Sequence, residues 1–218
     1  SSYNVTMLEV AEIFKSIQGE SSYMGIPCAF VRLTGCNLRC SWCDTEYAFR
    51  DGMRMSVGKV IAEIDQFGVE MVEVTGGEPL LQPKVYELML RLIKKKYLVL
   101  LETGGSLSIK DVPDEVFKIV DVKCPSSGET EKNYLENLQL LGPGDQIKFV
   151  IQDRRDYEYA RDFSRPWELF LKHRILFSPV FGKLDLKTLA EWILADNLTV
   201  RLQTQLHKHI WDKNAVGV

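Results

Sequence analysis

The sequence has few of the features that mark membrane or nucleic-acid-binding proteins. Its longest apolar runs, such as YLVLLE at 97–102, are much shorter than the roughly 18 residues that a membrane-spanning helix requires. No basic-then-apolar leader opens the chain. Lys and Arg number 27 against 30 Asp and Glu, so the net charge of -3 provides no basic field for nucleic acid. We expect a soluble, cytoplasmic protein that binds a small molecule and neither nucleic acid nor membrane.

The length of 218 residues suits one domain with a full core and is short for two. No repeat period and no low-complexity linker divides the chain. The opening SSYNVT, residues 1–6, precedes Met7 and has no apolar periodicity, which is typical of a tail. We expect a single domain over 1–218, with 1–6 outside the folded part.

Short β-rich runs alternate with helical patterns, which indicates strand–helix crossover units. Helices are expected from Ser56 to Gly68, over 83–96 and over 185–195, and Pro166 interrupts helical residues 154–172. Strands are expected at 28–34, 70–75, 97–102, 117–122, 146–151 and 174–179, with a short run at 199–202. This pattern predicts an α/β fold with about six mostly parallel strands, as an open sheet or an incomplete (β/α) barrel. The site should lie in the loops that follow the strands.

Five cysteines are an odd number, and three of them lie too close together for an ordinary disulfide framework. The segment GCNLRCSWCDT spaces Cys36, Cys40 and Cys43 as C-x3-C-x2-C. Thiolates at this spacing favour zinc, copper(I) or an iron–sulfur cluster. A closed zinc site requires four ligands, but the three histidines are all more than 120 residues away. Cys28 is expected to be a core residue, and Cys124 could be either a core residue or a ligand.

Three thiolates on a four-iron cluster leave one iron without a protein ligand, and an open coordination position is typical of a catalytic metal centre. A second motif, VTGGEPLLQP at 74–83, places two glycines at a strand end, where the backbone can approach a ligand closely. By itself this motif is also compatible with an ordinary strand-to-helix turn. The two motifs follow consecutive predicted strands, so they should meet at one edge of the sheet.

The three-cysteine spacing and the Gly-Gly-Glu-Pro at Gly76–Pro79 together resemble the radical S-adenosylmethionine (SAM) enzymes. The resemblance implies a [4Fe-4S] cluster whose open iron binds the amino and carboxylate groups of SAM. Residues 12–45, EIFKSIQGESSYMGIPCAFVRLTGCNLRCSWCDT, look like the 7-carboxy-7-deazaguanine synthases within that superfamily. The likeness extends in detail over about 8–80 and more loosely to ETGG at 102–105, DVKCPSSG and LQTQLHKHIW.

That resemblance implies a radical SAM core and a homodimeric lyase that converts 6-carboxy-5,6,7,8-tetrahydropterin into 7-carboxy-7-deazaguanine with loss of ammonia. SAM would be a reusable cofactor, Mg²⁺ would assist, and flavodoxin or ferredoxin would supply electrons. The chemistry would occur at the cluster and SAM, and the resemblance assigns no residue as a classical acid or base. Queuosine or another deazapurine would be the end product of the pathway.

The resemblance also implies the roles of individual residues. Cys36, Cys40 and Cys43 would bind the cluster, and Thr45 would bind Mg²⁺. The SAM contacts would be Trp42, Cys43, Asp44, Gly76, Gly77, Glu78, Cys124, Pro125 and Ser126. The substrate contacts would be Ile17, Gln18, Gly19, Arg32, Thr75, Glu102, Thr103 and His207. The sequence departs from many relatives at 124–126, where Cys-Pro-Ser stands in place of Ser-Pro-Lys.

Two alternatives remain at this point. An activase that installs a glycyl radical on a partner protein also carries CNLRCSWC and GGEPLLQ, although FKSIQGE and CDT favour the synthase. A zinc-bearing or cluster-bearing binding module is the alternative that is not an enzyme. Iron and sulfide analysis after anaerobic reconstitution would separate a zinc module from a cluster enzyme.

Overall fold

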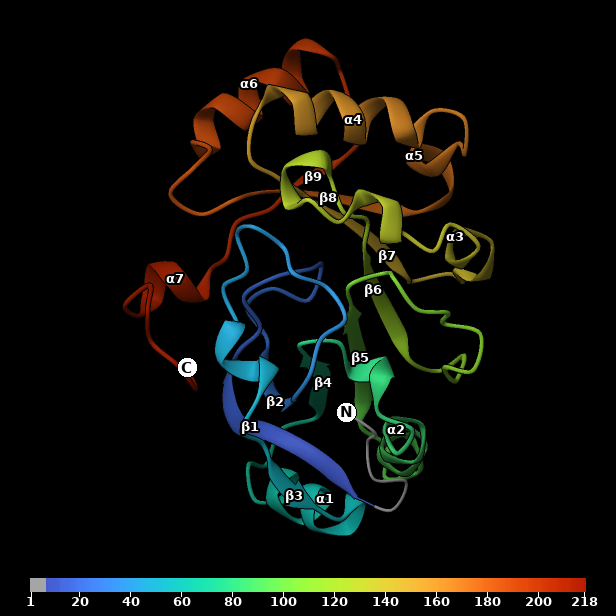
Figure 1. Ribbon diagram of the computed structural model, residues 1–218, viewed down its shortest axis with the longest axis vertical. Coiled ribbons are helices and arrows are strands. Elements are labelled where there is room, and N and C mark those ends of the chain that lie inside the picture. Colours follow the sequence, from blue (N-terminus) through green and yellow to red (C-terminus); the bar gives the residue numbers. More distant parts are fainter. Residues whose placement is uncertain (1–6) are drawn as a thin grey trace.

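The computed structural model describes residues 7–218, so the tail expected at 1–6 lies outside the described residues. Its centre is one open nine-stranded sheet with the order β3-β1-β2-β4-β5-β6-β7-β8-β9 (Figure 1). From β2 to β9 each neighbouring pair is parallel, whereas β1 and β3 are antiparallel to their neighbours. The strands are β1 (Leu8–Ile17), β2 (Pro27–Leu33), β3 (Met53–Met55), β4 (Met71–Gly76), β5 (Leu98–Thr103), β6 (Phe117–Asp121), β7 (Gln146–Ile151), β8 (Arg174–Pro179) and β9 (Arg201–Leu202).

This architecture confirms the predicted α/β fold with a mostly parallel sheet, which is open and does not close into a full barrel. The strands expected from the sequence are β2 and β4 to β9, and they pair in chain order, as crossover units predict. The sequence analysis did not anticipate β1 and β3. These two strands extend the sheet beyond β2 at one edge.

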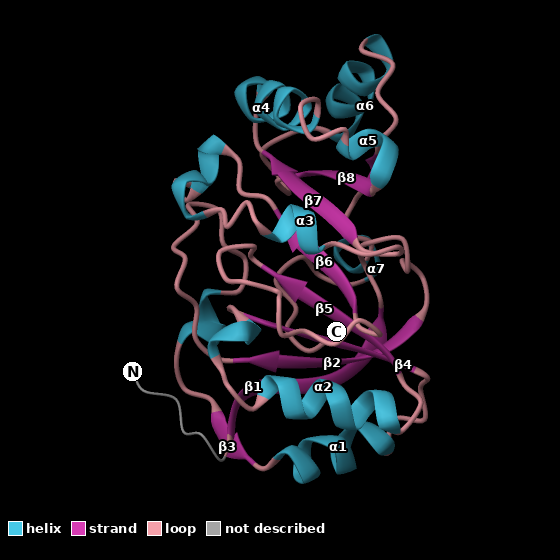
Figure 2. Cartoon of the chain, turned by 90° about the vertical axis from the view of Figure 1, so that its right-hand side faces the viewer, coloured by secondary structure: helices cyan, strands magenta, loops and turns pink. Residues whose placement is uncertain are grey.

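The helices cover the outer face of the sheet at two ends (Figure 2). Helices α1 and α2 pack together beside β1 and β5, whereas α4 and α5 pack on β7 and β8. The helices are α1 (Val57–Asp65), α2 (Val85–Lys94), α3 (Asn137–Leu140), α4 (Arg154–Ser164), α5 (Leu169–Lys172), α6 (Leu186–Ala195) and α7 (His207–Ile210). Single 3₁₀ turns occur as η1 (Glu46–Phe49), η2 (Pro79–Leu81), η3 (Pro125–Ser127) and η4 (Thr130–Lys132).

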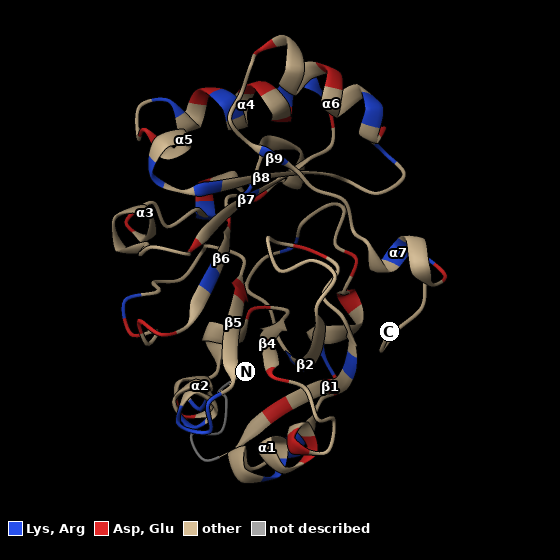
Figure 3. Ribbon diagram, turned by 180° about the vertical axis from the view of Figure 1, so that it is seen from behind, with Lys and Arg blue, Asp and Glu red and all other residues tan. Residues whose placement is uncertain are grey.

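Local sequence signals explain the helix ends. The Ser56 hydroxyl caps α1 by accepting a hydrogen bond from the Lys59 amide at 3.2 Å, as expected. The helical stretch around Pro166 is divided between α4 and α5, which confirms the predicted interruption. The ribbon colours of Figure 3 show that α4 and α6 contain residues of both charge signs. Among residues 7–218, no helix combines the length and the hydropathy needed to cross a bilayer.

Side chains alternate between the two faces of each strand, and this alternation builds the interior in layers. Towards the helices the strands bury an aliphatic core that includes Val72, Val74, Val99 and Leu101. On the opposite face lies a second apolar group, which we call the apolar floor. It consists of Cys28, Phe30, Met71, Leu100, Ile119 and Leu176.

Polar residues follow the apolar floor two positions further along the same strands. Phe30 is followed by Arg32, Met71 by Glu73, Leu100 by Glu102, Ile119 by Asp121 and Leu176 by Ser178. Lys148 occupies the equivalent level on β7, since its partner in the register of β6 is Asp121. The sheet therefore changes from apolar to charged just before its carboxyl-terminal edge, where parallel α/β folds carry their sites.

Candidate active site

The loops after β2, β4, β5 and β6 meet around one cavity of about 660 Å³. Backbone hydrogen bonds join the first two of these loops, from Gly77 N to Leu33 O at 3.2 Å and from Glu78 N to Gly35 O at 2.7 Å. The loops after β2 and β6 are joined by a bond from Ser41 N to Ser127 O at 3.1 Å. Segments far apart in the sequence therefore form one continuous wall.

Three of the five cysteines line this cavity. Cys36, Cys40 and Cys43 are free thiols that remain partly exposed. Burial raises the pKa of the Cys36 and Cys40 thiols above the usual value, so without a metal both stay protonated at neutral pH. Cys28 and Cys124 are fully buried in the core. Cys28 thus lies where the sequence suggested, and the structure decides the ambiguous Cys124 in favour of the core.

Glycine allows the second motif to approach the cysteine loop. A Cβ atom on Gly77 would lie 2.1 Å from Gly35 O and 3.0 Å from the Cys36 Cβ. Real Cβ atoms essentially never show contacts below 3.0 Å. Residue 77 must therefore be glycine for the two loops to meet as they do.

Glu78 holds the loops after β4 and β5 together instead of facing the cavity. Its fully buried carboxylate accepts hydrogen bonds from Gly104 N at 2.7 Å, Thr103 Oγ1 at 2.9 Å and Leu80 N at 3.0 Å. Burial raises the pKa of Glu78, while these three donors lower it. In this structure Glu78 acts on the cavity through the position of Thr103 and Gly104.

Two buried polar atoms beside the cysteines have no partner among the described residues, namely Trp42 Nε1 and Asp121 Oδ1. Lys123 lies between them, with its Nζ 5.2 Å from the centre of the Trp42 ring and 2.6 Å from Asp121 Oδ2. A donor and an acceptor left open in one cavity wall point to a bound polar ligand. Sequence reasoning missed Lys123 and Asp121, although both lie at the carboxyl end of β6.

These observations fit an iron–sulfur cluster with SAM. Three free thiols, a glycine contact that admits close approach, and two open polar atoms surround one space. Among residues 7–218, no group of three or more His, Cys, Asp or Glu side chains is placed to hold a single metal ion. Thiolates that bind a cluster are spread around several iron atoms and need not converge on one point.

The structure divides the predicted SAM contacts into two groups. Trp42, Cys43, Asp44, Gly76 and Gly77 line the cavity, whereas Glu78, Cys124, Pro125 and Ser126 are not among its lining residues. Instead, the segment 125–127 supports the cysteine loop, since Ser126 O accepts a hydrogen bond from Ser41 Oγ at 2.6 Å.

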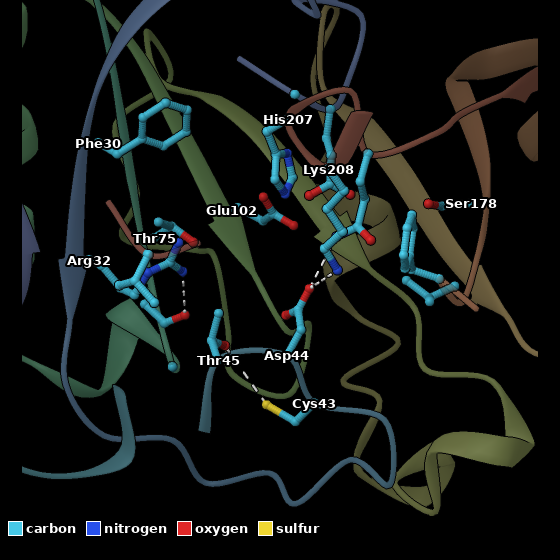
Figure 4. A pocket seen from close by; sticks show the side chains of 18 of the residues that line it. Phe30, Arg32, Cys43, Asp44, Thr45, Thr75, Glu102, Ser178, His207 and Lys208 are labelled. Carbon is cyan, nitrogen blue, oxygen red and sulfur yellow. Dashed lines mark hydrogen bonds and ion pairs between the residues drawn. The ribbon is translucent and has the colours of Figure 1, made fainter. Parts of the chain in front are cut away.

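All eight predicted substrate contacts line the cavity: Ile17, Gln18, Gly19, Arg32, Thr75, Glu102, Thr103 and His207. Figure 4 shows Glu102 and His207 facing the same space, with Arg32 and Thr75 close together beside it. A Cβ atom on Gly19 would lie 2.1 Å from His207 Nδ1, so glycine at this position makes room for the imidazole.

Arg32 is already fixed on one side. Its Nε donates to Glu12 Oε1 at 2.7 Å, and its Nη1 donates to Gly76 O at 3.3 Å. Tyr47 also donates to Glu12 Oε1, at 2.7 Å. A guanidinium held in this way is oriented before a ligand arrives, which lowers the entropic cost of binding a carboxylate.

The carboxyl-terminal segment reaches across to the cysteine loop. Asp44, next to Cys43, accepts hydrogen bonds from Gln205 Nε2 at 3.1 Å and Lys208 Nζ at 3.0 Å (Figure 4). Thr45 Oγ1, the predicted Mg²⁺ ligand, lies 3.8 Å from Cys43 Sγ and lines the cavity. Sequence reasoning did not identify Gln205 and Lys208, because side-chain partners more than 160 positions apart leave no local pattern.

A buried group of charges lies between the cavity and the apolar floor. Lys148 is paired with Glu102 and lies 3.6 Å from Glu20 Oε1. Glu73, only 4% exposed, accepts a hydrogen bond from Gln18 Nε2 at 2.9 Å. Two carboxyls, Glu20 and Glu102, thus share the Lys148 ammonium. Among the charged residues Lys148, Glu20, Glu73 and Glu102, only Glu102 was predicted from the sequence to lie in the site.

Comparison with known proteins agrees with this geometry. The model of the radical SAM superfamily matches residues 30–142. The chain is 49% identical to a 7-carboxy-7-deazaguanine synthase of Koribacter versatilis, over 97% of this chain and 100% of that one. It is 45% identical to the synthase of Chlorobaculum tepidum, over 97% of each chain.

Among solved structures, QueE from Escherichia coli superposes with a TM-score of 0.73 over 91% of this chain and 94% of that chain. The sequences are 22% identical, so this likeness supports the fold. The Streptococcus suis SuiB structure bound to S-adenosylmethionine has a TM-score of 0.55 and covers 78% of this chain.

Proposed function

Because the chain belongs to the 7-carboxy-7-deazaguanine synthases of the radical SAM superfamily, we propose that it converts 6-carboxy-5,6,7,8-tetrahydropterin into 7-carboxy-7-deazaguanine with loss of ammonia. It is a radical SAM lyase of deazapurine biosynthesis. The observation that carries the proposal is the convergence of the three cysteines, the glycine motif and the eight substrate-side residues around one cavity. The glycyl-radical activase is not favoured, since the relatives are synthases.

The cofactor end of the cavity is formed by the cysteine loop and the β4 loop. Cys36, Cys40 and Cys43 would hold a [4Fe-4S] cluster, which together with SAM supplies the radical chemistry of the superfamily when bound. Trp42, Asp44, Gly76 and Gly77 would contact SAM, and Glu78 would maintain the wall beside it. The open atoms Trp42 Nε1 and Asp121 Oδ1 are available for polar groups of the cofactor.

The substrate end lies deeper, above the apolar floor. The oriented Arg32 would pair the substrate carboxylate, and Gln18, Thr75 and His207 would hold the ring. The floor excludes water from below, which strengthens each of these polar contacts. These residues would thereby keep the ring in one orientation toward the cofactor.

Mg²⁺ would lie at Thr45, between cofactor and substrate. Mg²⁺ keeps several waters and takes few protein ligands, so one hydroxyl completed by ligand oxygens is a coherent shell. The carboxylate of Asp44 is the competing ligand, but it already accepts two hydrogen bonds from the carboxyl-terminal segment.

Partners and compartment complete the proposal. Flavodoxin or ferredoxin would reduce the cluster, and two copies of the chain would form a homodimer. Five free cysteines suit the reducing cytoplasm, where thiols persist. Equilibrium sedimentation would test the dimer.

The reaction can be tested by anaerobic incubation of the reconstituted protein with SAM, a reductant and the carboxytetrahydropterin. Mass spectrometry should find 7-carboxy-7-deazaguanine and an equal amount of ammonia, with SAM regenerated. Omitting SAM or the cluster serves as the control. A reconstituted protein with a full cluster and SAM bound that forms no deazapurine would contradict the proposal.

A further inference from the structure

The atoms of the proposed reaction balance without any net oxidation, since substrate and the two products contain the same atoms. To leave as ammonia, the departing ring nitrogen must lose both of its carbon bonds and gain two hydrogens, while two ring carbons each lose one hydrogen and one new carbon–carbon bond forms. In the last step the nitrogen is a primary amine on the contracted ring, so one proton must leave the neighbouring ring carbon and one must reach the amine. A residue that accepts a proton and then returns it is therefore useful at the substrate end of the cavity.

The carboxyl group placed for this task comes from the loop after β1. Glu20 and Lys148 both line the cavity, and Lys148 Nζ lies 3.6 Å from Glu20 Oε1. The side chain of Glu20 keeps 20% exposure, whereas that of Lys148 keeps 7%. Gln203 Nε2 donates to the same oxygen, Glu20 Oε1, at 3.2 Å. An ammonium and an amide thus hold one oxygen of the carboxyl while part of the side chain faces the cavity.

We propose that Glu20 is the proton-transfer residue of the ammonia-releasing step and that Lys148 is its positioning residue. This inference rests on the proposed function. The Glu20 carboxylate takes the ring proton, and the carbon–hydrogen electron pair becomes a ring double bond. The carbon–nitrogen bond breaks with its electron pair on nitrogen, and the Glu20 carboxyl returns the proton, so ammonia leaves. Glu20 ends as it began, and no oxidant or reductant is consumed in this step.

The other two carboxyls of the buried group are less suited to the task. Glu102 is paired directly with Lys148. Burial alone would raise the pKa of Glu102, but Lys148 lowers it overall, so this group stays ionised and returns a proton poorly. Glu73 is only 4% exposed, and burial raises its pKa well above the usual value, which disfavours the carboxylate that must take the ring proton. Of the three carboxyls, only Glu20 is suited both to accept the ring proton and to return it.

Burial and the surrounding charges set the pKa of Glu20. Burial raises the pKa of Glu20 to about 7, and Lys148 on β7 opposes this rise. Glu102 on β5 and Asp44 in the cysteine loop raise it further, whereas Lys208 on α7 lowers it. Glu73 on β4 is electrostatically linked to Glu20 as well. Because the step begins with the carboxylate, ammonia release should slow as the pH falls below about 7.

The test uses the reconstituted enzyme in single-turnover reactions with substrate, measuring ammonia and 7-carboxy-7-deazaguanine across pH. Glu20→Gln should keep cluster content and SAM binding but slow ammonia release about 10²- to 10⁴-fold. Glu20→Asp keeps a carboxylate, so it should recover part of the rate. It should also recover the fall in rate at low pH, which we call the acid limb. Lys148→Met removes the cation that lowers the Glu20 pKa and should shift the acid limb to higher pH. Lys148→Arg keeps the charge and should shift it less.

Lys118→Met is the matched control. Lys118 is also a buried lysine, with its Nζ 3.6 Å from Asp145 Oδ2, but it faces away from the cavity. This variant should leave the pH profile unchanged. In the cluster-free protein, carbon-13 NMR of labelled glutamate should show one carboxyl with a midpoint near 7 that is absent in Glu20→Gln. That signal should move to higher pH in Lys148→Met.

The outcomes separate the two proposals. If the wild type releases no ammonia, the proposed function fails and this inference fails with it. If the wild type releases ammonia while Glu20→Gln keeps both the rate and the acid limb, only this inference is overturned. A Glu20 carboxyl that titrates below pH 5 in the cluster-free protein would overturn it as well.

Discussion

Replacing Gly77 by Ala adds a single methyl group at the closest contact between the two signature motifs. That carbon would lie 2.1 Å from Gly35 O and 3.0 Å from the Cys36 Cβ. Both neighbours belong to the cysteine loop, and the nearer one is a backbone atom that cannot rotate away. Gly77 has no positive φ, so its backbone conformation suits alanine and the contact alone causes the effect.

The expected size follows from these distances. Since real Cβ atoms essentially never come closer than 3.0 Å, the two loops must separate by about 1 Å. Displacement of this size can reduce the rate of a positioned reaction on the order of a hundredfold. Overpacking in a tight site typically costs about 1–3 kcal/mol. For a chain of this length, each kcal/mol lowers the Tm by about 2–4 °C.

The assay measures iron and sulfide after anaerobic reconstitution, together with SAM affinity and the Tm of the cluster-free protein. Gly77→Ala should lower the iron and sulfide content, the SAM affinity and the Tm. The matched control is Gly58→Ala in α1, where the added carbon meets nothing closer than Arg91 Nη2 at 3.5 Å. This control should keep cluster content and SAM affinity, and alanine in a helix should stabilise it by about 0.5–1 kcal/mol. Gly77→Ala with wild-type iron, sulfide and SAM affinity would refute the idea that this contact positions the cysteine loop.

Three further predictions concern the residues assigned by family. Cys36→Ala should abolish the cluster absorption while Cys28→Ala keeps it; loss of the cluster in a folded Cys28→Ala protein would contradict the assignment. Arg32→Lys should weaken substrate binding in calorimetry and leave SAM binding intact, because lysine cannot form a bidentate pair; an equal loss of SAM affinity would move Arg32 to the cofactor. Thr45→Val should lose most of the Mg²⁺ stimulation with cluster content unchanged. If Asp44→Asn loses that stimulation instead, the metal belongs to Asp44.

The sequence predicted most of the fold because parallel strands buried on both faces read as short apolar runs between helices. It did not predict β1, whose residues alternate only weakly between buried and exposed positions and precede the first crossover unit. It did not predict β3 either, because three residues are too few for a periodic pattern. Both strands pair in antiparallel fashion, so the alternation of strands and helices that indicates parallel crossover units does not predict them.

The site was predictable where one loop carries its own motif, as in the cysteine segment and at Gly76 and Gly77. The buried ion group was not, because Lys148 and Glu20 are 128 positions apart. A lysine in the apolar run QIKFVI reads as a strand residue, and only the folded arrangement around the cavity shows which carboxylates it meets. Cys124 illustrates the converse, since a residue in a loop after β6 is buried in an apolar cluster with Ile147 and Phe149 instead of facing the cavity.

Hydrogen bonds from the loop after β1 join it to β7 and to the segment after β9. Ser21 N donates to Gln203 Oε1 at 2.7 Å, and Ser22 N donates to Gln146 Oε1 at 3.0 Å. The same loop carries Gln18 and Glu20 into the cavity. A ligand that binds to this loop therefore also stabilises these contacts with β7 and the segment after β9, and its binding free energy adds to the stability of this arrangement. Amide protons of this loop should exchange with solvent more slowly in the complex than in the free protein, while those of the central strands stay as they were.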